Sequence, residues 1–233
     1  MNAYKRFSYY YDEVVEQLDY SLWLNFVIPY LHYNDSILDL ACGTGTLAMM
    51  LKLKEFDVSG LDLSSEIIEI AKEKAKVNHL NIPYYVMDMT DFKIDKKFNV
   101  ITCFFDSINF LKTVDNVKKL LTCVKDHVVD GGYFICDIFS KALFDQYKNN
   151  VLEDDYDLFK IKWVTKTRDE RTLLHDIVIQ EDGNYYHEYY YEYLYNIDDL
   201  KIDGLKLVQK CGDFNEDLED EDERILLVFK KEQ

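Results

Sequence analysis

The first part of the chain carries apolar and aromatic residues at the spacing of an amphipathic helix. Between about Tyr4 and Leu31 they recur at intervals of three or four positions. The residues of this stripe are Phe7, Tyr11, Val14, Val15, Leu18, Leu22, Trp23 and Phe26. The spacing predicts one or two helices that end near Pro29.

From Ser36 onward, short apolar runs alternate with segments of helical period. Strands are predicted over Ile37–Leu40, Asp57–Leu61, Tyr84–Met87, Asn99–Phe105 and Tyr133–Asp137, and helices over Thr46–Lys54, Ser65–Asn78 and Asp115–His127. Gly131 and Gly132 are interpreted as the turn that leads into the fifth strand. Strands that alternate with helices imply right-handed crossovers, and therefore a parallel sheet with helices on both faces.

The alternation of strands and helices stops after Phe144. Three later segments, Leu158–Thr167, Leu173–Glu181 and Tyr185–Tyr195, alternate apolar and polar residues instead, and the turn sequence EDGN joins the last two. This pattern predicts an antiparallel insertion after the fifth strand.

The last part of the chain returns to the pattern of the sheet. A short helix is predicted from Ile197, followed by strands over Leu205–Cys211 and Arg224–Lys230 that would form a closing antiparallel hairpin. The acidic sequence between these strands, DFNEDLEDEDE, predicts a solvated connection.

Composition narrows the class of protein. No apolar run approaches the roughly 18 residues of a membrane span, and the N-terminus lacks the apolar core of a secretory signal. The five cysteines are odd in number, scattered, and mostly placed within apolar runs. We therefore expect a cytoplasmic protein with reduced core thiols, no disulfide framework and no metal site.

The formal net charge of −17 limits the choice of partner. Binding of RNA or DNA depends on Lys and Arg, and the one basic cluster, Lys160 to Arg171, alternates with acidic and apolar residues. We expect no nucleic acid and no membrane as partner. A small molecule is favoured, with a basic macromolecule as the alternative.

The sequence ILDLACGTGTLA, Ile37–Ala48, predicts a nucleotide-binding loop between a strand and a helix. Its second half fits the GxGxxA form of a dinucleotide fingerprint. Asp39, however, ends the strand four residues before Gly43, where it would repel a pyrophosphate and attract an ammonium group. Asp62 ends the second strand and suits the ribose of either type of ligand.

The run Ile37–Gly45 resembles motif I of the class I S-adenosylmethionine-dependent methyltransferases, with Ala41 in place of the usual first glycine. VMDMTDF resembles their motif III, and Asn99–Leu111 resembles the strand and loop that face the methyl group. The resemblance implies that the loop underlies the methionine part, Asp62 binds the ribose, Asp88 reads the adenine and Met89 packs on it. The implied residues for S-adenosyl-L-methionine are Tyr11, Asp39, Ala41, Cys42, Gly43, Gly45, Asp62, Leu63, Asp88, Met89 and Phe104.

The N-terminal pattern YxxFxxxYDxxxxxxxYxxW resembles small bacterial methyltransferases with a helical lid. In such proteins a lid tyrosine, here Tyr11, closes over the cofactor carboxylate; simple core packing is the alternative for these aromatic residues. The resemblance implies a Rossmann-like, doubly wound, mostly parallel seven-stranded sheet. It also implies a lid over residues 1–35, a cofactor-binding domain over 36–140 and 196–233, and an antiparallel substrate-side cap over 141–195.

Methyl transfer requires a general base only where the acceptor must lose a proton. The candidates for that role are Asp106 at the end of the fourth strand and His175 on the insertion, followed by Tyr185, His187 and Glu188. We expect a methyltransferase with a small-molecule acceptor. A macromolecular acceptor (protein or RNA) and a non-catalytic cofactor-binding module stay open, whereas Asp39 and the closing hairpin disfavour an NAD-dependent dehydrogenase. The oligomeric state is open.

Overall fold

The computed structural model describes residues 6–232, so Tyr4 of the N-terminal pattern lies outside the described residues. The helices are α1 (Phe7–Val14), α2 (Ser21–Val27), α3 (Thr46–Leu53), α4 (Ser65–Val77), α5 (Val114–His127) and α6 (Lys141–Gln146), with 3-10 turns η1 (Ile28–Tyr30), η2 (Ser107–Phe110) and η3 (Ile197–Leu200). The strands are β1 (Ser36–Leu40), β2 (Asp57–Asp62), β3 (Tyr84–Val86), β4 (Phe98–Cys103), β5 (Val128–Phe139), β6 (Val151–Asp155), β7 (Lys160–Asp169), β8 (Thr172–Glu181), β9 (Asn184–Tyr193), β10 (Leu205–Gly212) and β11 (Arg224–Lys231).

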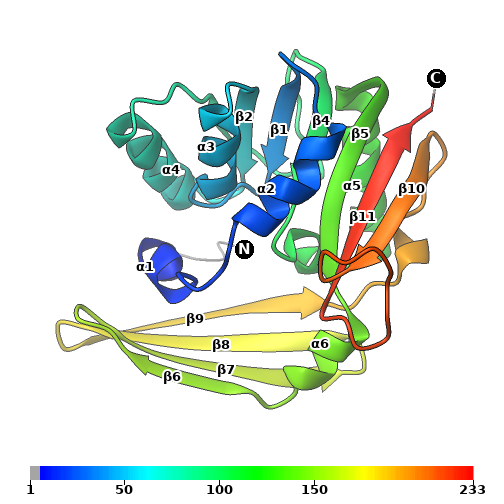
Figure 1. Cartoon of the computed structure of the whole chain (residues 1–233). Helices are drawn as coiled ribbons and strands as arrows, with labels where there is room; N and C mark the ends of the chain where they lie inside the picture. Colours follow the sequence, from blue (N-terminus) through cyan, green and yellow to red (C-terminus); the bar gives the residue numbers. More distant parts are fainter. Residues whose placement is uncertain (1–5, 233) are drawn as a thin grey trace.

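The main sheet has seven strands in the order β10-β11-β5-β4-β1-β2-β3 (Figure 1). β1 pairs in parallel with both β2 and β4, and β4 pairs in parallel with β5. β11 pairs antiparallel with both β5 and β10, so the last two strands close the sheet as a hairpin. The predicted fold class, a mostly parallel sheet with a closing hairpin and an antiparallel insertion, is confirmed.

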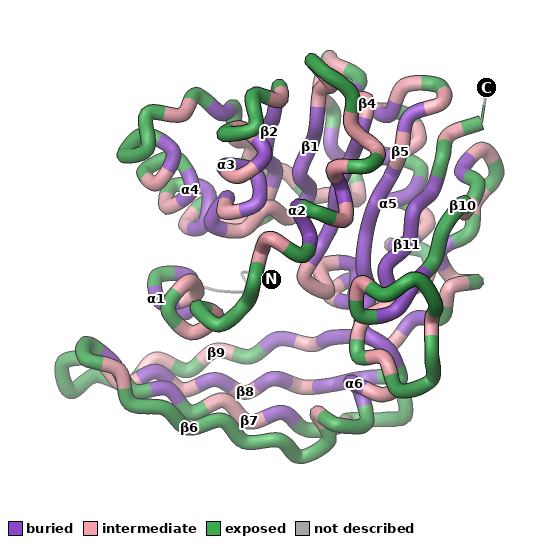
Figure 2. Tube along the Cα trace, viewed as in Figure 1, coloured by how far each residue is buried: buried purple, intermediate pink, exposed green. Residues whose placement is uncertain are grey.

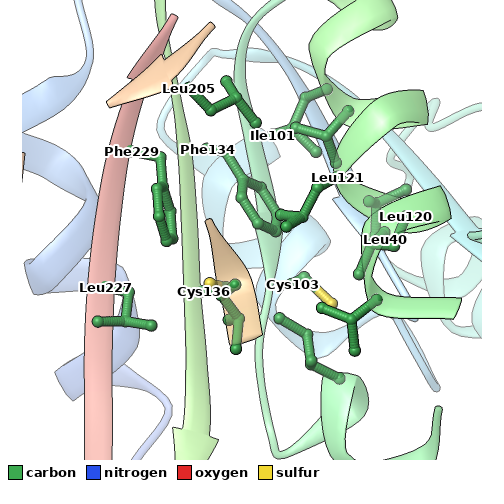
Figure 3. Close-up of a cluster of buried hydrophobic side chains, with 14 of the residues drawn as sticks. Leu40, Ile101, Cys103, Leu120, Leu121, Phe134, Cys136, Leu205, Leu227 and Phe229 are labelled. Carbon is green, nitrogen blue, oxygen red and sulfur yellow. The ribbon is translucent and has the colours of Figure 1, made fainter. Parts of the chain in front are cut away.

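Helices cover both faces of this sheet, as the alternating pattern predicts. On one face, α5 packs on the sheet through a cluster that includes Leu40, Ile101, Leu121, Phe134 and Phe229, all essentially inaccessible to solvent (Figure 3). On the other face, α2 and α3 pack on the sheet through a second cluster whose members include Trp23, Val27, Leu47, Leu51 and Val100. The two clusters place the hydrophobic core on either side of β1, β4 and β5.

The insertion forms a separate antiparallel sheet in the order β6-β7-β8-β9. The predicted turn Glu181–Asn184 joins β8 to β9. Helix α1 lies between this sheet and the main domain (Figure 1). Phe7 and Tyr10 from α1 share a buried cluster with Ile177 and Tyr190 from the second sheet and with Phe159, which precedes β7. The N-terminal helix therefore bridges the two sheets.

Several local features differ from the sequence-based expectation, among them the unpredicted short helix α6. Gly131 and Gly132 do not precede the fifth strand but lie within β5, where the register against β4 shifts between Phe98 and Val100. A Cβ on Gly132 would come within 2.6 Å of the Asn99 carbonyl oxygen, so glycine is needed there for the close approach of the strands. β6 was not expected because it is exposed along its whole length and shows no apolar alternation (Figure 2).

No helix within residues 6–232 is long and apolar enough to cross a membrane. The five cysteines are free thiols, and Cys103, Cys136 and Cys211 are buried.

Candidate active site

A cavity of about 370 Å³ opens at the carboxyl ends of β1, β2 and β4 and reaches the second sheet. Ligands of open α/β sheets bind at this edge, where the order of strands reverses, and β1 stands at that reversal here. The volume falls within the range of about 300–1,000 Å³ typical of small-molecule sites. The lining residues are Tyr11, Tyr20, Asp39, Ala41, Cys42, Gly43, Thr44, Thr46, Leu47, Leu61, Asp62, Leu63, Ser64, Ile67, Met87, Asp88, Met89, Phe104, Phe105, Ser107, Phe110, Leu111, Lys112, Asn116, Tyr190, Tyr191 and Tyr193.

The glycine loop forms the floor of the cavity. Ala41, Gly43 and Gly45 all have left-handed backbone conformations, with φ of 51°, 55° and 79°. Gly45 does not itself line the cavity but stands immediately before α3, where a Cβ would come within 2.4 Å of the Tyr84 hydroxyl. Glycine at this position therefore permits both the turn and the close packing beneath the loop.

Asp39 lies at the end of β1 with 3% of its surface exposed. One carboxylate oxygen accepts a hydrogen bond from Thr102 Oγ1 at 2.7 Å. Burial raises the pKa of Asp39 to about 7; the Thr102 hydrogen bond opposes this and the Asp62 charge adds to it. An ionised Asp39 would therefore gain from a cationic ligand in the cavity.

Asp62 ends β2 and connects two parts of the cavity wall. Its carboxylate accepts the backbone N–H of Gly43 at 3.1 Å and that of Ser64 at 2.9 Å. Burial raises the pKa of Asp62, and the backbone hydrogen bonds lower it. The side chain thus fixes the glycine loop relative to the start of α4 while it lines the cavity.

Asp88 follows β3 and is held in a tight turn. One of its carboxylate oxygens accepts hydrogen bonds from Thr90 N and Thr90 Oγ1, both at 2.7 Å. The neighbouring side chains Met87 and Met89 also line the cavity and pack against the core beneath it. This arrangement presents a carboxylate beside an apolar wall.

Tyr11 from α1 and Tyr20 before α2 cover the cavity on the N-terminal side. Burial raises the pKa of both phenols, so they stay neutral at ordinary pH. Tyr20 is part of the N-terminal pattern YxxFxxxYDxxxxxxxYxxW, for which core packing is the alternative, and the structure places it in the cavity lining. Helix α1 is held here by Asp12, which binds the Lys74 ammonium group and accepts the Thr44 hydroxyl at 2.6 Å.

The loop after β4 supplies the wall that faces the second sheet. Phe104, Phe105 and Ser107 line the cavity, whereas Asp106 is turned to the Arg224 guanidinium, with Oδ1 to Nη1 at 2.6 Å. Burial raises the pKa of Asp106, the Arg224 charge lowers it, and the Asp137 charge raises it further. Asp106 is thus adjacent to the cavity without lining it.

His175 is buried within the second sheet. Its Nδ1 accepts the Trp163 indole N–H at 3.0 Å, and its Nε2 lies 2.9 Å from Glu192 Oε2. The imidazole stacks on the Tyr190 ring at 4.6 Å, and Tyr190 lines the cavity, so one aromatic ring separates His175 from the cavity.

The other candidates on the insertion, Tyr185, His187 and Glu188, likewise lie outside the cavity lining, and His187 pairs with Asp176. The sequence-predicted residues Tyr11, Asp39, Ala41, Cys42, Gly43, Asp62, Leu63, Asp88, Met89 and Phe104 are brought together around the cavity. A role of Asp106 or His175 as base stays a prediction.

Comparisons with known proteins agree with this site. The family described as "Methyltransferase domain" matches residues 37–132. A protein of Geobacillus sp. (strain WCH70), named as a candidate methyltransferase, is 27% identical over 98% of this chain and 100% of its own. The crystal structure of an S-adenosylmethionine-dependent methyltransferase from Clostridium acetobutylicum ATCC 824 is 29% identical, with a TM-score of 0.85 over 98% of each chain.

A third relative resembles only part of the chain. The dTDP-4-amino-2,3,4,6-tetradeoxy-D-glucose N,N-dimethyltransferase of Saccharopolyspora spinosa is 30% identical over 44% of this chain and 39% of its own.

The fold, the site and these relatives define an enzyme that transfers methyl groups. The matched domain, the Geobacillus relative and the Clostridium structure together support a class I S-adenosylmethionine-dependent methyltransferase with S-adenosyl-L-methionine as cofactor.

Proposed function

We propose that the protein transfers the methyl group of S-adenosylmethionine to a small-molecule acceptor held between the loop after β4 and strand β9. The observation that carries this proposal is the single continuous cavity. At one end it is lined by the glycine loop and by the acids at the carboxyl ends of β1, β2 and β3. At the other end it is lined by aromatic residues of the segment after β4, Phe105 and Phe110, and of β9, Tyr190 and Tyr193. A cavity of this kind has room for a cofactor and an apolar, enclosed acceptor side.

The assignment of one end of the cavity to the cofactor follows from the chemistry of the residues that line it. Asp62 would accept the ribose hydroxyls, and Asp88 the adenine amino group, with Met89 against the ring. Asp39 supplies negative charge for the ammonium group, and Tyr11 covers the cofactor carboxylate. The loop residues Ala41, Cys42, Gly43 and Gly45, together with Leu63 and Phe104, complete the proposed binding set.

Bound S-adenosylmethionine supplies an activated methyl group on a sulfonium, so the chain itself needs no nucleophile. The protein orients the acceptor, excludes water and fixes charge around the site. Where the acceptor must lose a proton, Asp106 is the first candidate to accept it, because the flanking residues Phe105 and Ser107 line the cavity. His175 is the second candidate, since Tyr190 lies between it and the cavity.

Domain roles follow from the same arrangement. Residues 1–35 would act as the lid, residues 141–195 as the substrate-side cap, and residues 36–140 with 196–233 as the cofactor-binding domain. In support, the N-terminal segment contacts both the cofactor-binding domain and the cap. Asp12 on α1 binds Lys74 on α4, and Arg6 just before α1 pairs with Glu181 at the turn of the second sheet.

The acceptor class is supported by charge and by relatives. A net charge of −17 disfavours RNA, and the Saccharopolyspora relative is named as acting on a nucleotide-linked amino sugar. Small amines are therefore the first acceptors to test.

The test is transfer of a labelled methyl group from S-adenosylmethionine to amino sugars, nucleotide-linked amino sugars and other small amines, with RNA and a basic protein alongside. We expect label in a small molecule, and none with Asp62→Ala at the same cofactor concentration. Label only in RNA or in the basic protein would refute the small-molecule proposal.

A further inference from the structure

The backbone after β4 is held in an unfavourable conformation beside the cavity. Phe105 and Asp106 are consecutive non-glycine residues with φ of 58° and 59°. Residues with a Cβ rarely adopt this left-handed region, so surrounding contacts must maintain it. The Phe105 ring lines the cavity and packs on Trp23 at 4.4 Å and Tyr20 at 4.7 Å.

Asp137 on β5 holds the backbone of this segment. Its buried carboxylate accepts the N–H of Phe105 at 3.3 Å and the N–H of Asp106 at 3.0 Å. The Trp23 indole N–H also donates to it, at 2.8 Å. One carboxylate thus ties the strained segment to α2 and to the centre of the sheet.

Arg224, the first residue of β11, binds the same segment through its side chain. Its Nη1 lies 2.6 Å from Asp106 Oδ1 and 2.9 Å from Asp137 Oδ2, and its Nη2 lies 3.3 Å from Asp106 Oδ2. The guanidinium also lies over the Trp23 ring, with Cζ 5.2 Å from the centroid. The two Nη atoms thus bind both oxygens of Asp106 while Nη1 also contacts Asp137, and a lysine ammonium group cannot reproduce this two-pronged contact with Asp106.

The acidic connection before β11 fixes the backbone of Arg224. The Asp213 carboxylate accepts the N–H of Arg224 at 2.9 Å and that of Glu223 at 3.0 Å. The Asp213 N–H donates to the Arg224 carbonyl at 3.0 Å. A segment whose sequence predicts only a solvated loop therefore anchors the residue that holds the cavity wall.

We propose that Arg224 is a positioning residue of the methyl-transfer site, which acts through Asp106 and Asp137 to hold Phe105 against the cavity. Arg224 and Asp137 do not line the cavity, so their effect must pass through the Phe105–Asp106 segment. Asp106 also interacts electrostatically with Glu192 from β9 and with the phenols of Tyr11 and Tyr147. The inference rests on the proposed cofactor site and not on the chemical class of the acceptor, so it can fail while the proposed acceptor class stands.

The test is a double-mutant cycle on affinity for S-adenosylhomocysteine, measured by calorimetric titration. Arg224→Lys keeps the charge but loses the fork, and Asp106→Asn keeps a side chain that tolerates the left-handed region. We expect each change to weaken binding about tenfold, and the double variant to bind no more weakly than the weaker single variant. Lys230→Gln, an exposed residue on the same strand, is the matched control and should change affinity by less than about twofold.

Affinity equal to that of the wild type in Arg224→Lys, or losses that multiply in the double variant, would overturn the proposal, because either result means that Arg224 does not act through Asp106. Thermal unfolding of each variant verifies that the fold is retained. If Arg224→Lys does not fold, Asp213→Asn tests the same claim without altering the guanidinium. That variant should bind S-adenosylhomocysteine about threefold more weakly or worse, and unchanged affinity would refute the proposal.

Discussion

Replacing Asp39 by Asn should make the empty protein more stable and its cofactor binding weaker. Asp39 is buried at the end of β1, lines the cavity and accepts the Thr102 hydroxyl at 2.7 Å. Asn has nearly the same shape, and its carbonyl oxygen can accept the same hydrogen bond. The substitution therefore removes the charge and little else.

The size of the stability change follows from the pKa of Asp39. Burial raises this pKa from 3.8 to about 7. Because the folded state has the higher pKa, the unfolded chain releases this proton first, and stability is lost as the pH rises from about 4 to about 7. At about 1.4 kcal/mol per pKa unit, the ionised side chain costs the empty protein about 4 kcal/mol above that range. Asp39→Asn should recover up to this amount at about pH 8 and much less at about pH 5.

The effect on the cofactor has the opposite sign. A charge-assisted hydrogen bond contributes about 1.5–3 kcal/mol, so loss of the Asp39 charge should weaken S-adenosylmethionine binding by about tenfold to about hundredfold. Denaturant unfolding at the two pH values measures the first effect, and calorimetric titration the second. A variant that is less stable at about pH 8, or that binds the cofactor as tightly as the wild type, would refute the reasoning.

Three further substitutions test other parts of the site. Gly45→Ala places a Cβ 2.4 Å from the Tyr84 hydroxyl and should lower the free energy of unfolding by about 1–3 kcal/mol. Adding Tyr84→Phe should recover part of this loss, and an unchanged melting temperature of Gly45→Ala would contradict the prediction. Asp62→Ala removes an acceptor of loop N–H groups and should weaken S-adenosylhomocysteine binding at least about tenfold by calorimetry, whereas unchanged affinity would exclude the ribose assignment. Lys74→Met removes the cation that binds Asp12 on α1 and should speed limited proteolysis of α1 in the empty protein; equal cleavage rates would show that the ion pair does not hold the helix.

Much of the main domain could be predicted because its signals are local. The spacing of apolar residues along a helix or strand indicates which of its sides is buried. The strand expected over Asp57–Leu61 is accordingly found over Asp57–Asp62. The glycine loop and the acids at the carboxyl ends of β1, β2 and β3 could also be located, because parallel strands bring their carboxyl ends to one edge of the sheet. The sequence around each of these strands therefore locates the residues on the proposed cofactor side of the cavity.

The proposed acceptor side of the cavity depends on contacts between segments that are far apart in the sequence, and a local sequence pattern does not indicate such contacts. Nothing in the sequence near Arg224 indicates that its guanidinium meets Asp106 and Asp137, which lie far from it along the chain. Tyr20 and Phe105 line the cavity because α2 packs against the loop after β4. An aromatic residue on a helix gives the same sequence signal whether it fills a core or a cavity wall.

The structure of the complex with S-adenosylhomocysteine is the most direct test of the central claim, that this cavity holds the cofactor with its sulfur towards the loop after β4. We expect the ribose hydroxyls within hydrogen-bond distance of the Asp62 carboxylate, the adenine beside Asp88, and the sulfur facing Phe104. A complex in which the adenine lies against β9, or in which the ligand binds outside the cavity, would contradict the account.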